Sequence, residues 1–93
     1  MPVRGRAGTS AVLREALRSE VRRLRAEPSP VEQVRGVSDV LATLEAEYER
    51  LNALRLDAVV ALRGEGLGYD AVATATGLSR SRVAQLLRQA RAR

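Results

Sequence analysis

The sequence predicts an all-α fold of about four helices, and three observations support this class. Apolar residues recur at steps of three and four along most of the chain, and no stretch shows the two-residue alternation of a strand. Glycine and proline gather in short clusters between the periodic stretches, where helices end. The length of 93 residues and the hydrophobic content of 45% suit a small domain.

The first helix is expected to follow a flexible arm. Residues 1–8, MPVRGRAG, show no apolar periodicity. Thr9 or Ser10 then offers an N-cap, and the EPSP stretch at residues 27–30 ends the helix. The apolar stripe of this helix consists of Leu13, Leu17, Val21 and Leu24.

The second helix is expected to begin at a capping box, with Ser29 as N-cap, Pro30 at the first helical position and Glu32 three residues after the cap. A 3.5-residue repeat, typical of helices that pack lengthwise, follows in Val34, Val37, Leu41, Leu44, Tyr48 and Leu51. Leu54, Ala58, Val59 and Leu62 continue a broader stripe. The helix should reach about Arg63, with Gly36 as the point where it would kink.

The GEGLG stretch at residues 64–68 predicts the end of the second helix, with Gly64 or Gly66 in the left-handed conformation. It lacks the preceding strand and the Lys-Ser/Thr pair of a phosphate-binding P-loop. Two short helices are expected after it, over residues 69–76 and 79–91, separated by a Gly-Leu turn.

These last two helices have the features of a helix-turn-helix without a wing. The small residue Ala73 lies four positions before the turn glycine Gly77, and apolar residues occupy the inner positions of both helices. Ser79 can cap the second of them. Its polar residues lie off the apolar stripe, and arginine, glutamine and serine are side chains that pair with base edges in the major groove of DNA.

The charge distribution also favours a nucleic-acid partner. All 16 basic residues are arginine and the net charge is +5. Residues 71–93 contain five arginines and no acid, whereas residues 31–70 contain four arginines and eight acids. Arginines on an acid-free segment neutralise phosphates without repelling the DNA backbone.

The segment GYDAVATATGLSRSRVAQLLRQARAR resembles the helix-turn-helix of sigma-factor region 4 and of small bacterial regulators. The match covers about residues 69–91, and more loosely 52–91. It implies that Arg80, Ser81, Gln85 and Arg88 face DNA and that Val72, Ala73, Gly77, Leu78, Val83 and Leu86 are structural. Sigma proteins usually carry an acid where this chain has Ser81, and the rest of a sigma factor is missing. Neither a sigma function nor a known promoter element is therefore expected.

The sequence thus predicts a bacterial, cytoplasmic and nucleoid-associated transcriptional regulator, a repressor that acts by occupying double-stranded DNA. The expected DNA-binding residues are Ser79, Arg80, Ser81, Arg82, Gln85, Arg88, Gln89 and Arg91. Two alternatives stay open. One is a partition or nucleoid protein that coats DNA, and the other is an adaptor whose motif docks RNA polymerase or a partner protein.

The repeat from Val34 to Leu51 can pack on the first helix of the same chain or form a homodimer. We favour the homodimer, because a small helix-turn-helix usually gains affinity by pairing two half-sites. The expected organisation is a flexible arm at 1–8, a dimerisation region at 9–51 and a DNA-binding region at 52–93, together one compact domain.

Several functions are not expected. The chain has no cysteine and no histidine, which excludes disulfides, Cys/His zinc sites and Ser-His triads. Glu45, Glu47 and Glu49 are expected to form a solvated face rather than a metal or catalytic site. We therefore expect no enzyme, cofactor, metal or membrane span.

Arginines in the first helix can contact flanking DNA or pair with the acidic middle, and Arg4 and Arg6 can enter a minor groove.

Overall fold

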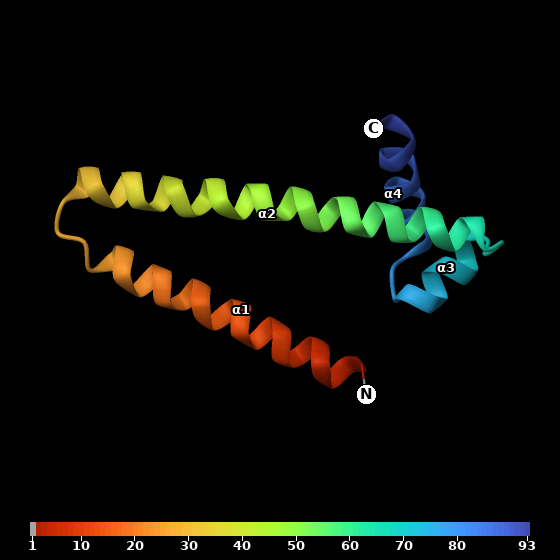
Figure 1. The fold of residues 1–93 in the computed structure, drawn as a ribbon, viewed down its shortest axis with the longest axis horizontal. Coiled ribbons are helices and arrows are strands. Elements are labelled where there is room, and N and C mark those ends of the chain that lie inside the picture. The colour runs from red at the N-terminus through yellow and green to blue at the C-terminus, as the bar shows by residue number, and fades with distance from the viewer. Residues whose placement is uncertain (1) are drawn as a thin grey trace. The chain divides into compact units, whose positions relative to one another are not determined.

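The computed structural model describes the backbone of residues 2–93 and the side chains of residues 10–93. This part of the chain contains four helices: α1 (Pro2–Arg25), α2 (Pro30–Gly64), α3 (Tyr69–Thr76) and α4 (Arg80–Ala92) (Figure 1). The predicted all-α class is confirmed, and the predicted ends of the last three helices lie within one residue of those observed.

The N-terminal arm differs from expectation. Helix α1 begins at Pro2, so the arm predicted at residues 1–8 is helical where the structure describes it, and Ser10 lies inside the helix rather than at its cap. Proline is well suited to a first helical turn, and alanine and arginine both favour helix, so this stretch needs no apolar stripe to continue α1. The side chains of Arg4 and Arg6 lie outside the described residues, and their role stays a prediction.

The chain divides into two compact units, Met1–Thr43 and Leu44–Arg93. The sequence placed this boundary at residues 51 and 52, inside one compact domain. The difference arises because α2 continues without a break through both positions, so no turn residue marks the change. We describe the two units separately.

In the first unit, the predicted cap of α2 is confirmed and the predicted box is only half formed. The Ser29 hydroxyl accepts a hydrogen bond from the Glu32 N–H at 3.3 Å. The Ser29 N–H, however, donates to the carboxylate of Glu27 at 3.1 Å, and Glu32 instead pairs with Arg35 at 3.0 Å. An acid before the cap has thus taken the position expected for Glu32, since both can reach the same N–H group.

Gly36 does not kink α2, and its role is to let α1 approach. A Cβ atom added there would lie 2.5 Å from Cδ2 of Leu24, a residue that is only 7% exposed. The side-chain amide of Gln33 also donates to the carbonyl oxygen of Leu24 at 3.0 Å. Gln33, Gly36 and the half-buried Val40 share one face of α2 by their spacing. This face is therefore the one that packs within the chain.

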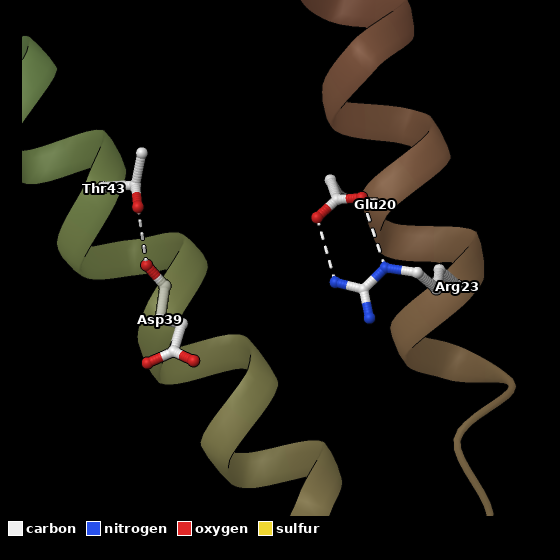
Figure 2. Close-up of polar contacts among 4 residues, drawn as sticks. All are labelled: Glu20, Arg23, Asp39 and Thr43. Carbon is white, nitrogen blue, oxygen red and sulfur yellow. Dashed lines mark hydrogen bonds and ion pairs between the residues drawn. The ribbon is translucent and has the colours of Figure 1, made fainter.

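Figure 2 shows two polar contacts of the first unit, each within a single helix. Arg23 donates to both carboxylate oxygens of Glu20, at 2.9 and 3.3 Å. These hydrogen bonds, aided by charge attraction, lower the pKa of Glu20 and raise the pKa of Arg23. The Thr43 hydroxyl donates to the carbonyl oxygen of Asp39 at 3.0 Å, within the same helix.

The arginines of α1 pair within their own helix where they pair at all. Arg22 lies 3.1 Å from Glu15, in addition to the Arg23–Glu20 pair. Among the described side chains of the first unit, no ion pair joins α1 to an acid of α2. Pairing with the acidic middle, one of the two roles that the sequence left open for these arginines, is thus not seen within this unit.

The second unit has its own core, built from three helices. Its buried residues are Leu56 and Val59 of α2, Val72 of α3, and Val83, Leu86 and Leu87 of α4. Val72, Val83 and Leu86 are fully buried, which confirms the apolar positions predicted for the helix-turn-helix. Leu56 and Leu87 were not predicted, and Leu54, placed in the predicted stripe, is 66% exposed.

Helix α2 ends in a Schellman motif. The Leu67 N–H donates to the Leu62 carbonyl at 3.3 Å and the Gly66 N–H donates to the Arg63 carbonyl at 2.9 Å. Gly66, with φ of +96°, is the left-handed residue, and Gly64 is not. The motif reverses the chain so that α3 can pack back on the end of α2.

Gly77 forms the turn between α3 and α4. Its φ is +78°, and its N–H donates to the Ala73 carbonyl at 2.9 Å. The Ser79 hydroxyl then accepts from the Arg82 N–H at 3.0 Å and starts α4. These bonds connect the small residue, the turn and the cap that the sequence predicted.

Substituting Gly77→Ala should destabilise the second unit by about 1–2 kcal/mol, because L-residues pay that cost in the left-handed region. Nothing lies within 4 Å of an added Cβ atom, so the cost is backbone strain rather than a clash. Urea unfolding measures it. Gly64→Ala is the control, because a Cβ atom added there also has nothing within 4 Å and Gly64 has no positive φ. This change should leave the stability unchanged or raise it. Equal effects of the two changes would contradict the turn assignment.

Candidate nucleic-acid interface

Helix α4 presents two opposite sides. Val83, Leu86 and Leu87 are buried against the core of the second unit. Ser81, Gln85 and Arg88, spaced by four and three residues, are exposed on the other side. We call these three residues the outward stripe. Three of the four residues that the family resemblance placed toward DNA are therefore brought to a single exposed face.

Arginines border the outward stripe along α4. Arg80 and Arg91 are eleven residues apart, about three helical turns, and share one edge of the helix. Arg82 and Gln89 share the other edge at a spacing of seven. The N-terminus of α4 adds unpaired backbone N–H groups, which favour an anion. The helix thus combines a polar stripe with two arginines at one edge and one arginine at the other.

The side chain of Arg80 is not free in this structure. Its Nε atom lies 2.8 Å from Oδ1 of Asp70, and its guanidinium carbon lies 5.4 Å from the ring centroid of Tyr69. Both partners come from the start of α3. Arg80 is therefore held at the edge of α4, away from the outward stripe with which the sequence grouped it.

Gln85 and Arg82 form a hydrogen-bonded pair on α4. The Arg82 guanidinium donates to the amide oxygen of Gln85 at 2.6 Å. An amide oxygen has two lone pairs and the amide nitrogen two N–H groups, so Gln85 can still bond a base while Arg82 holds it. Arg82 itself is half-buried, and Ser79 is engaged as the helix cap. Both residues were predicted to contact DNA, and each also has a structural role: Ser79 caps α4 and Arg82 positions Gln85.

A shallow groove lies beside the edge that carries Arg91. Its volume is about 300 Å³, and it is lined by Val60, Arg63, Tyr69, Leu87, Ala90 and Arg91. The guanidinium carbon of Arg63 lies 5.1 Å from the Tyr69 ring centroid. The sequence did not point to these two residues, because Arg63 precedes the motif and Tyr69 is its first residue, ahead of the positions assigned to the core or to DNA. An arginine and an aromatic residue flanking the glycine-rich turn were the available signal.

Arg93 is also held by an ion pair. Its guanidinium pairs with the carboxylate of Asp57 on α2. This contact fastens the end of α4 within the second unit.

The repeat on α2 is exposed within the chain. Val34, Val37, Leu41, Leu44, Tyr48 and Leu51 are between 37% and 66% exposed. We call them the apolar stripe. The face that packs against α1 is the neighbouring one, which carries Gly36. Within the first unit, the stripe residues Val34, Val37 and Leu41 thus remain exposed beside the face that packs on α1.

Among the side chains of residues 10–93, no cluster of three acids that could hold a metal ion is present. None of the described helices combines the length and apolarity needed to cross a bilayer.

The chain matches no protein-family model, no curated protein and no solved structure. The likeness to sigma-factor region 4 stays a prediction from the motif.

Proposed function

We propose that the protein binds double-stranded DNA sequence-specifically, as a homodimer that represses transcription by occupying its site. The observation that carries this proposal is the division of α4 into a buried side, an exposed polar stripe, an edge with Arg80 and Arg91, and an opposite edge with Arg82. A solvated surface helix requires the buried side, but it does not require a polar stripe with arginines at its edges.

Helix α4 has dimensions that suit the major groove, which is about 12 Å wide, whereas a helix with its side chains is about 10–12 Å across. In that position Arg88 can pair with guanine, Gln85 with adenine, and Ser81 with either. The arginines at the edges meet phosphates of the two strands, which adds affinity without sequence preference. Base and backbone contacts are thus separated on the helix.

The homodimer is supported by the exposed apolar stripe of α2. Six apolar side chains at coiled-coil spacing face solvent in one chain, and pairing with a second copy would remove them from water. Two copies present two α4 helices, which suits a DNA site made of two half-sites.

Site selection from random DNA duplexes tests the proposal. We expect the wild-type protein to select a two-fold-symmetric site. Gln85→Ala and Arg88→Ala should each relax preference at particular base pairs, a loss of about 1–3 kcal/mol of discrimination. Arg35→Ala, which removes an exposed arginine of α2 from the first unit, is the matched control and should select the wild-type site.

The other outcomes favour the alternatives. Tight binding without any selected sequence indicates a DNA-coating protein. No binding even at low salt overturns a DNA function and leaves the protein-interaction adaptor. An unchanged selected site for both variants overturns the assignment of the outward stripe.

A further inference from the structure

We propose that Arg63, Tyr69, Arg80 and Arg91 form a binding site for a DNA phosphate at one edge of α4. We call these residues and Asp70 the Tyr69 cluster. The inference rests on the proposed function and extends it, since Arg63 and Tyr69 lie outside the predicted helix-turn-helix contacts.

Tyr69 is the centre of the cluster. The guanidinium carbons of Arg63 and Arg80 lie 5.1 and 5.4 Å from its ring centroid, within the range of cation–π attraction. The ring is half-buried and packs against the core of the second unit. The fixed ring therefore has two positive groups, one from α2 and one from α4, within cation–π range.

Arg63 is further oriented by the backbone and keeps most of its donors. Its guanidinium donates to the Leu67 carbonyl at 2.8 Å. A guanidinium has five N–H groups, so one such bond leaves the others available. Arg91 lines the same groove as Arg63 and Tyr69, and the described lining of that groove includes no acid. The groove thus has positive donors over an apolar floor.

Asp70 is the carboxylate of the cluster. Its Oδ1 atom lies 2.8 Å from Nε of Arg80. The cluster contains three arginines and one carboxylate, which contacts Arg80, so the cluster carries an excess of positive charge. Arginine donors in a fixed arrangement match the oxygens of a phosphate. Because the Arg80–Asp70 pair is exposed, it contributes little stability, and a phosphate can replace Asp70 at small cost.

The source of the phosphate follows from the position of the cluster on α4. Arg80 and Arg91 form the edge next to the outward stripe, so a duplex that contacts Ser81, Gln85 and Arg88 brings its backbone to this edge. We therefore assign the site to the phosphodiester backbone of DNA rather than to a free anion.

The salt dependence of DNA binding tests this assignment. Loss of one phosphate contact should reduce the slope of log K against log salt by about 0.9, so Arg63→Ala should show that smaller slope. It should weaken selected and unrelated sequences by the same factor and leave the selected site unchanged. Arg63→Lys, which keeps the charge, should retain most of the slope. Arg35→Ala again serves as the control of equal charge.

Asp70→Asn gives the opposite result. Freeing Arg80 from an exposed ion pair should tighten DNA binding about 1.5- to 5-fold at low salt. The selected bases should not change, because Arg80 contacts the backbone. If Arg80→Ala instead alters the selected bases, Arg80 belongs with the outward stripe and the assignment is overturned.

Two further outcomes separate the proposals. If the wild-type protein selects a DNA site while Arg63→Ala behaves like Arg35→Ala, the phosphate site is overturned and the proposed function stands. If wild-type protein binds no DNA, both are overturned. A titration with inorganic phosphate tests whether the site binds a free anion instead. The titration is followed by the side-chain Nε–H signal of Arg63 in NMR spectra. Saturation by inorganic phosphate with no response to DNA would overturn the DNA assignment.

Discussion

Leu86→Ala is expected to unfold the second unit. Leu86 is fully buried, and a buried Leu→Ala change costs about 2–5 kcal/mol. A core of this size rarely supplies more than about 3–5 kcal/mol in total, so the change removes most or all of its stability. NMR spectra should show the amide signals of residues 69–92 collapsing into the narrow range of a disordered chain, and specific DNA binding should disappear.

Leu54→Ala is the control for this experiment, since it makes the same chemical change at a residue that is 66% exposed. This change should leave the NMR signals of α3 and α4 folded and alter the free energy of unfolding by no more than about 0.5 kcal/mol. Folded spectra for Leu86→Ala would mean that the three-helix core described above is not what holds α3 and α4 together.

The double change Leu41→Glu with Leu44→Glu is expected to give a folded monomer that binds DNA weakly. Both leucines belong to the exposed apolar stripe, so neither change buries a charge within one chain. In a dimer the four added carboxylates would lie in the apolar seam, where an unpaired charge is strongly unfavourable. Sedimentation equilibrium should show a monomer, and affinity for a two-half-site duplex should fall about 10²- to 10⁴-fold as the second half-site is lost.

Ala46→Glu with Ala53→Glu is the matched control, because these exposed residues lie on the opposite side of α2 from the apolar stripe by helical spacing. This variant should remain dimeric with wild-type affinity. A dimer for the Leu41 and Leu44 variant would show that the two copies meet elsewhere, and affinity for a single half-site distinguishes that outcome from a damaged DNA interface.

Much of the fold was predictable because its signals are local. Ser29 and Ser79 cap helices through bonds to residues three positions ahead, and Gly77 adopts a left-handed conformation that few other residues accept. Each of these features depends on a few neighbouring residues. The ends of α2, α3 and α4 were therefore fixed by chemistry visible in the sequence.

The remainder depended on contacts between distant residues. Gly36 was expected to kink α2, but Leu24 packs at that position and makes the glycine useful in a straight helix. Leu54 and Leu56 are both leucines on one helix, and only the packing of α3 and α4 decides that Leu56 is buried. The Arg80–Asp70 pair joins two helices across the turn, so no periodicity announces it.

The Arg82–Gln85 hydrogen bond has a consequence for the thermodynamics of recognition. A free glutamine side chain loses rotamer entropy when a base immobilises it, a cost of about 0.5–1.5 kcal/mol for an interface side chain. Here part of that entropy is lost when the chain folds, before any DNA is present. In the proposed complex with DNA, Arg82 would influence sequence preference by restricting the conformations of Gln85, whether or not Arg82 itself touches a base.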